Sequence, residues 1–157
     1  TRILYPGDCR SRGLDMDNAI FNENRDCRVC SEPLESHRGG GEGCGFIDAQ
    51  ADADGWVHCG LHNANRGLTL ALSYPKETLP ALANWQHWGM GDYVTALEPG
   101  TNSPIGRSAA REQGELIMLE PGGSRRYELR FTVYDNPDDA GEYTPAMAGL
   151  ELAFEEG

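Results

Sequence analysis

The sequence predicts an antiparallel all-β protein, either a β-sandwich or part of one. Short runs alternate between apolar and polar residues with a period of two, and turns rich in Gly and Pro separate these runs. No window of a dozen residues carries an apolar stripe with helical spacing. Because 157 residues is the usual length of one domain, we expect a single β domain over residues 1–157.

The first part of that domain, residues 1–45, is predicted to be a loop-rich N-terminal segment with two short strands. It is rich in Gly, Arg, Asp, Asn and Cys, and it ends in the stretch HRGGGEGCG, which is typical of a flexible connection. The remaining residues, 46–157, are predicted to form the β-sandwich core.

The core is expected to begin with a hairpin. Two strand-like runs flank the turn Asp52–Gly55, and Asp-Gly between such runs favours a hairpin because Gly accepts the positive φ of a type I′ turn. After a further turn at 63–67, residues 68–74 alternate as a half-buried strand does, with Leu68, Leu70, Leu72 and Tyr74 on one face.

Three more strands are predicted at 92–98, 114–120 and 125–135, after a Pro-bracketed connection at 74–85. In the last of them the residues on one face are Tyr127, Leu129, Phe131 and Val133. A final alternation at 150–154 is predicted to close the chain.

Charge and composition exclude several classes of partner. The net charge of −12 repels phosphate backbones and anionic lipid surfaces, so we expect no nucleic-acid partner. No apolar stretch approaches the ~20 residues that span a bilayer, so we expect no membrane role. The cysteines are five, an odd number, and no export signal is evident at the start, which favours free thiols and a cytoplasmic location.

The stretch DYVTALEP contains the first candidate catalytic residue, Glu98. A period of two places Val94, Ala96 and Glu98 on one face, opposite Tyr93, Thr95 and Leu97. Pro99 is expected to end the strand and hold the carboxylate at a sheet rim, where it can act in proton transfer. A solvated acid with no catalytic role is the alternative.

An ordered string of motifs over residues 55–133 carries a family resemblance. Its parts are Leu79-Pro80, Trp85, the Gly-containing turn before Tyr93, Glu98-Pro99, Asn102, Gly106-Arg107 and Leu119-Glu120-Pro121-Gly122. The string resembles the C-terminal half of the aldose 1-epimerase-like proteins of the galactose mutarotase superfamily, a group long catalogued as a domain of unknown function. Residues 1–54 match only loosely.

This resemblance implies a β-supersandwich that binds an aldose or modified aldose, with no metal and no cofactor. Glu98 is similar to the base that takes the proton from the anomeric hydroxyl, while a histidine protonates the ring oxygen so that the ring opens and closes again as the other anomer. The histidines of that mechanism lie in an N-terminal half that has no counterpart in this chain. Gln86 also departs from the family, where a basic residue is common.

Local residues supply further candidates. His87 is the best candidate acid, with a structural histidine as the alternative. The aromatic side chains of Trp85, Trp88 and Tyr93 are candidates for stacking on a sugar, or else they fill the core. Asn102 and Arg107 are candidates for binding sugar hydroxyls, although Asn102 could equally cap a turn.

Two other functions stay open. One is a non-catalytic carbohydrate-binding module that keeps the aromatic site. The other is a zinc-stapled interaction domain, for which the ligands would be Cys27, Cys30, His37, Cys44, His58, Cys59 and His62, although their spacing matches no standard finger. Because half of a supersandwich would leave open, partly apolar edges, we also expect a homo-oligomer or a second chain that completes the fold.

Overall fold

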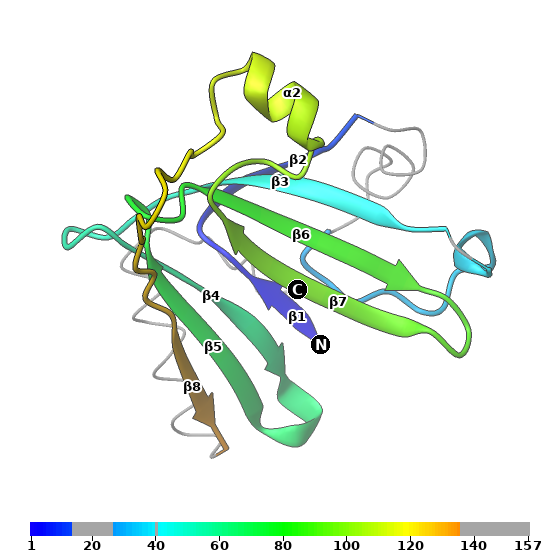
Figure 1. Ribbon diagram of the computed structural model, residues 1–157. Coiled ribbons are helices and arrows are strands. Elements are labelled where there is room, and N and C mark those ends of the chain that lie inside the picture. The colour runs from blue at the N-terminus through cyan, green and yellow to red at the C-terminus, as the bar shows by residue number, and fades with distance from the viewer. Residues whose placement is uncertain (14–26, 40, 136–157) are drawn as a thin grey trace.

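The protein is built from two four-stranded antiparallel sheets that form two layers (Figure 1). The computed structural model describes residues 1–13, 27–39 and 41–135. Sheet A has the strand order β1-β4-β5-β8, and sheet B has the order β2-β3-β6-β7. The predicted all-β antiparallel class is confirmed.

The strands are β1 (Arg2–Leu4), β2 (Gly7–Ser11), β3 (Gly43–Ala49), β4 (Trp56–Asn63), β5 (Leu68–Pro75), β6 (Ala81–Trp88), β7 (Tyr93–Gly100) and β8 (Arg130–Tyr134). The helical elements are the 3₁₀ turns η1 (Glu35–His37) and η2 (Ala64–Arg66) and the short helix α2 (Arg107–Glu112). Within the described ranges, no helix is long and apolar enough to cross a membrane.

The core lies between the two sheets and follows the period of two. Sheet B contributes Ile47, Leu82 and Trp88, and sheet A contributes residues such as Val57 and Cys59. Full burial of a large apolar side chain stabilises the fold by about 1.5–3 kcal/mol. Burial also raises the pKa of the Cys59 thiol to about 12, so Cys59 is a neutral member of this core.

The predicted hairpin around Asp52–Gly55 is wrong, because its two strands belong to different sheets. β3 pairs with β2 and β6 in sheet B, whereas β4 pairs with β1 and β5 in sheet A. The turn itself is present: the Gly55 N–H donates to the Asp52 carbonyl at 3.0 Å, and Gly55 has a φ of 81°. Turn chemistry therefore reverses the chain here without pairing the strands that it joins.

Three other expectations differ from the structure. The central strand β6 (Ala81–Trp88) begins within the segment 74–85, which is predicted to be a connection, and the segment 114–120, predicted to be a strand, forms none. The last predicted strand shortens to β8 at Arg130–Tyr134, and β3 begins within the segment predicted to be loop. The alternation at 150–154 lies outside the described residues.

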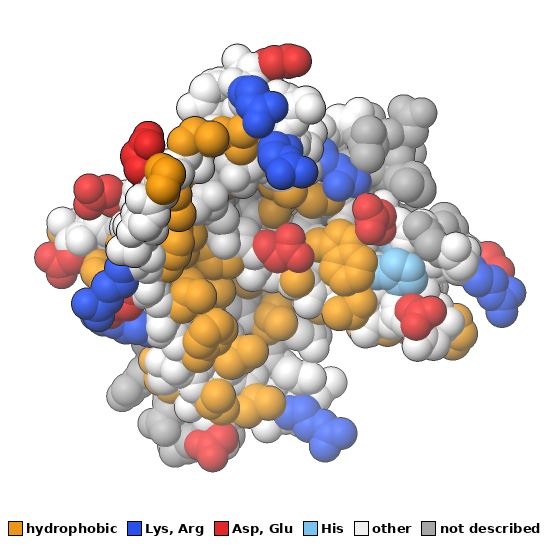
Figure 2. Space-filling view, viewed as in Figure 1, with side chains coloured by type: hydrophobic (Ala, Val, Ile, Leu, Met, Phe, Trp, Pro, Cys, Tyr) orange, Lys and Arg blue, Asp and Glu red, His pale blue; other side chains and the backbone are white. Residues whose placement is uncertain are grey.

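The sandwich is open along the side where β7 and β8 are edge strands. Phe131 and Val133 pair with Leu72 and Leu70, and Leu72 belongs to the core, so all four side chains share the core-facing side of sheet A. Yet Phe131 is 65% exposed and Val133 is 60% exposed. Figure 2 shows hydrophobic side chains gathered over β5 and β8. The described residues thus leave this part of the core face uncovered.

Candidate functional site

The candidate site lies on the outer face of sheet B, which is the face turned away from sheet A. The register places one residue from each strand in a row across the sheet: Arg10 of β2 opposite Phe46 of β3, Phe46 opposite Ala83 of β6, and Ala83 opposite Glu98 of β7. We call these four residues the Glu98 row. Phe46 and Ala83 pack with Cys44, Trp85 and Ile105 in a second apolar cluster, distinct from the core between the sheets.

Glu98 is an exposed carboxylate among small side chains. Its partner across the strand pair is Ala83, and Ala96 is the next residue on the same face of β7. The predicted alternation of β7 is confirmed, but the strand continues to Gly100, so Pro99 does not end it. A proline is tolerated here because β7 is an edge strand with a neighbour on one side only.

Trp85 lies beside the Glu98 row and is held in place by an acid that the sequence analysis did not single out. The Trp85 indole N–H donates to the Glu42 carboxylate at 2.7 Å, and Arg12 lies 3.4 Å from the same carboxylate. The hydrogen bond from Trp85, reinforced by Arg12 and by the nearby His87, holds the pKa of Glu42 below its usual value. Glu42 was missed because it lies within the Gly-rich stretch taken for a flexible connection.

His87 lies on the same outer face as Glu98 but not close to it. It pairs with Val94, which is four residues, or about 13 Å of antiparallel strand, from Glu98. Trp85 lies between them, with its ring centroid 6.1 Å from that of His87. The His87 Nδ1 donates to the backbone carbonyl of Asp92. This separation is too large for His87 and Glu98 to act on the same sugar ring.

Trp88 and Tyr93, the other predicted stacking residues, lie on the opposite face of sheet B from Glu98. Trp88 is 1% exposed, and its ring lies 4.9 Å from that of Tyr93, whose hydroxyl donates to the Ser31 carbonyl. The period of two explains the result: Trp85 and Trp88 are three residues apart on one strand, so they point to opposite faces. Gln86 also points inward, so its departure from a basic residue leaves the outer face unchanged.

A cavity of about 570 Å³ is lined by Arg10 and Phe46 of the Glu98 row, whereas Ala83 and Glu98 are not part of its lining. It opens between the ends of β2, β3 and β6 and the segment 101–117, and its lining includes Arg10, Phe46, Asp48, Asn102 and Glu115. This volume is within the usual range of small-molecule sites. In Figure 2, hydrophobic, acidic and histidine side chains lie next to one another over β6 and β7.

The two residues predicted to bind sugar hydroxyls, Asn102 and Arg107, lie at different places in the structure. Asn102 lines the cavity, but its side chain is also bound locally, since it donates to the Ser103 carbonyl at 2.9 Å and accepts from the Thr101 hydroxyl at 3.1 Å. It therefore caps a turn as well, which was the alternative for this residue. Arg107 is exposed at the start of α2 and is not part of the cavity lining.

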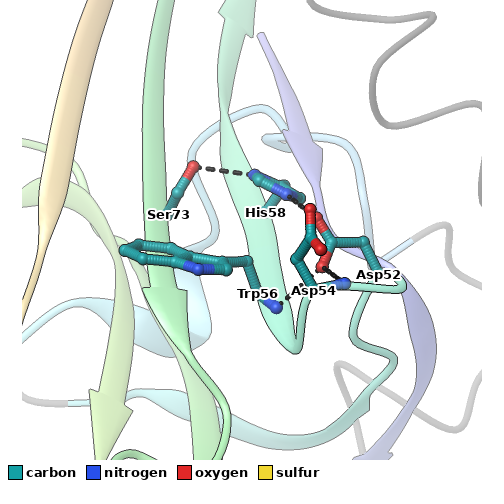
Figure 3. Close-up of polar contacts among 5 residues, drawn as sticks. All are labelled: Asp52, Asp54, Trp56, His58 and Ser73. Carbon is teal, nitrogen blue, oxygen red and sulfur yellow. Dashed lines mark hydrogen bonds and ion pairs between the residues drawn. The ribbon is translucent and has the colours of Figure 1, made fainter.

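A second polar cluster lies on the outer face of sheet A, around His58 (Figure 3). Asp52 accepts a hydrogen bond from His58 Nε2 at 2.9 Å, which leaves Nδ1 to accept from the Ser73 hydroxyl at 2.8 Å. The other Asp52 oxygen accepts from the backbone N–H groups of Asp54 and Trp56. The hydrogen bond from His58, followed by that from Trp56, lowers the pKa of Asp52.

This cluster has the order of groups found in serine hydrolases, but its contacts favour a structural role. Asp52 ties the turn between the two sheets to the first part of β4, and His58 links it in turn to Ser73 of β5. We interpret the cluster as the support that fixes the crossing from sheet B to sheet A.

The residues of the zinc alternative are not gathered by the fold. His58 is bound to Asp52 and Ser73, His62 lies 2.8 Å from the Thr69 hydroxyl, and Cys59 is buried in the core. In the portion of the chain that the structure describes, no group of three or more His, Cys, Asp and Glu side chains is placed to hold a metal ion.

Comparisons with known proteins place this geometry in context. The model of a family described as "Domain of unknown function (DUF4432)" matches residues 10–133. A solved structure from Klebsiella pneumoniae subsp. pneumoniae, described as a candidate aldose 1-epimerase, is similar with a TM-score of 0.82 and 19% sequence identity. The match covers 97% of this chain and 38% of that chain, so this chain spans well under half of its neighbour's length. At this identity the likeness establishes the fold alone. A comparison with curated proteins found no match.

Proposed function

The chain belongs to the family described as "Domain of unknown function (DUF4432)", and we propose that it carries part of the active site of an aldose 1-epimerase-like isomerase with Glu98 as the base. The observation that carries the proposal is the outer face of sheet B: an exposed carboxylate with small neighbours lies beside Trp85, in the row whose Arg10 and Phe46 line a cavity of about 570 Å³. The likeness in fold to the Klebsiella protein supports the proposal.

In the proposed reaction, Glu98 accepts the proton of the anomeric hydroxyl. As that O–H bond breaks, the bond between the anomeric carbon and the ring oxygen also breaks, and an acid gives a proton to the ring oxygen. Rotation of the resulting aldehyde and closure of the ring, with the proton transfers reversed, gives the other anomer. Ala83 and Ala96, the neighbours of Glu98 on this face, have small side chains that do not project past the carboxylate, and Ala83 is buried in the second apolar cluster. The rigid ring of Trp85, fixed by Glu42, offers a flat surface for sugar C–H groups.

The acid is proposed to come from outside this chain, because His87 lies about 13 Å along the strands from Glu98. The similar Klebsiella chain is much longer than this one, since the match covers only 38% of it. A further segment of polypeptide, either from a longer chain or from a second copy, would cover the exposed core-facing side of β5 and β8 and could supply this acid.

The test is the rate of exchange between α and β anomers of several aldoses, measured by saturation-transfer NMR near neutral pH. General-base catalysis contributes about 10²–10⁴-fold, so Glu98→Gln should remove about 100-fold or more of the acceleration. Glu120→Gln is the matched control, because Glu120 is exposed and belongs to no strand of sheet B.

A Glu98→Gln protein that is as active as the wild type would refute the role of Glu98. The second candidate function, a carbohydrate-binding module, is favoured by the separation of His87 from Glu98. It predicts that sugars bind the wild type and the Glu98→Gln variant alike, with no acceleration of exchange by either.

A further inference from the structure

Arg10 occupies the far end of the Glu98 row, and none of the residues that the structure describes neutralises its charge. Its guanidinium carbon lies 5.5 Å from the centroid of the Phe46 ring, and the residue lines the cavity. Among the described residues, no hydrogen bond or ion pair engages its guanidinium. Arg12, which follows the end of β2, differs in this respect because it pairs with Glu42.

The acidic side chains that line the same cavity already have partners. Asp48 lies 3.7 Å from the Lys76 ammonium, and Glu115 accepts a hydrogen bond from the Ser103 backbone N–H at 3.2 Å. The chain has a net charge of −12, yet none of the described carboxylates engages Arg10, so the cavity has a positive group available to a ligand.

The distance between Arg10 and Glu98 suits a ligand with two recognised ends. Phe46 and Glu98 are two strands apart, or about 10 Å between backbones, and the Arg10 guanidinium lies over Phe46. Between them lies Ala83, which is buried in the second apolar cluster together with Phe46 and Trp85. A sugar with its anomeric carbon at Glu98 would lie over this apolar cluster, so that its opposite end reaches Arg10.

We propose that this site takes an aldose with an anionic group at the end remote from the anomeric carbon, such as a carboxylate or phosphate at C6, and that Arg10 binds the anion. The proposal rests on the proposed function for the position of the anomeric carbon. The planar guanidinium presents paired N–H donors that match a carboxylate or phosphate, and its stacking on Phe46 restricts its motion before the ligand arrives.

The test is a calorimetric titration of the full chain with D-glucose, D-glucuronate and D-glucose 6-phosphate. The wild type should bind the two anionic sugars more tightly than glucose. In Arg10→Gln, the ratio of anionic to neutral affinity should fall about tenfold or more, as expected for loss of a charge-assisted hydrogen bond. Arg10→Lys, which keeps the charge but not the paired N–H donors, should retain part of the preference for the anionic sugars.

Arg66→Gln is the matched control, because it removes the same charge from the exposed turn η2, away from the cavity. This control should leave the affinity ratio at the wild-type value. Circular dichroism of each variant establishes that the fold is retained. The preference of carboxylate against phosphate distinguishes the two anions.

Three results would overturn the proposal: equal affinity for the three sugars, no binding of any of them, or an affinity ratio that Arg10→Gln leaves unchanged. Arg10 would then be a solvated cation that covers Phe46. The two proposals fail separately. If Glu98→Gln abolishes anomer exchange while Arg10→Gln changes no affinity ratio, the isomerase stands and the anion site falls. If Arg10→Gln lowers the affinity ratio but the wild type accelerates the anomer exchange of no sugar, the anion site stands and the isomerase falls.

Discussion

The buried amide of Gln86 gives the sharpest test of how this sandwich is held together. Gln86 is 1% exposed and lies between the sheets. Its Nε2 donates to the Cys27 carbonyl at 2.9 Å and to Asn84 Oδ1 at 2.7 Å, while its Oε1 accepts from Trp88 Nε1 at 3.0 Å. Within the described ranges, every buried side-chain nitrogen or oxygen has a hydrogen-bond partner.

Replacing Gln86 by Met keeps the length of the side chain and removes all three hydrogen bonds. The Trp88 N–H, the Asn84 oxygen and the Cys27 carbonyl each lose a partner inside the protein, and the first two belong to fully buried side chains. A buried polar group left unsatisfied costs about 1–3 kcal/mol, so two such groups give about 2–6 kcal/mol. Because a flexible Met lets the site relax, we expect the free energy of unfolding to fall by about 3 kcal/mol.

Urea denaturation followed by tryptophan fluorescence measures this change. The midpoint should fall while the slope of free energy against urea concentration stays constant. Gln50→Met is the control, since Gln50 is exposed, and its effect should stay within about 0.5 kcal/mol. If Gln86→Met were as stable as this control, the amide network would contribute no net stability and the reasoning would fail.

Two further outcomes are expected. The hydrogen bond from His58 is the main reason why the folded pKa of Asp52 lies below its ordinary value of 3.8. The stabilising effect of Asp52 is therefore complete above pH 3.8 and is lost as the pH falls through the folded pKa. Asp52→Asn should weaken the dependence of Tm on pH in acid, and an unchanged dependence would contradict this account. Phe131→Ser should reduce concentration-dependent self-association in sedimentation velocity, because Phe131 lies on the exposed core-facing side of β8. Thr132→Ser, on the other face of β8, is the control and should not reduce it. A wild-type protein that stays monomeric at all concentrations would count against the interpretation of this face as open.

The elements that the sequence predicted well are those where one face is buried and the other is not. On β7 the alternation correctly separates Glu98 from Tyr93, because the period of two belongs to any extended chain. The turn residues at Asp52–Gly55 likewise adopt the local geometry that their chemistry favours.

β6 was missed because it is a central strand whose core-facing positions include Asn84 and Gln86. These polar side chains are buried, where they hydrogen-bond to each other, so the strand shows no simple alternation of apolar and polar residues. Without β6 as a strand, Trp85 and Trp88 could not be assigned to opposite faces, and both were expected at the sugar site.

By itself, the sequence determined the all-β class, the alternation along individual strands and the face that carries Glu98, because these follow from residues within a few positions of one another. Only the tertiary structure decided that β3 and β4 belong to different sheets and that Arg10, Phe46, Ala83 and Glu98 share one row. Strand partners are chosen by the apolar surface that the whole sandwich buries and by hydrogen bonds between distant segments, and no local pattern contains that information.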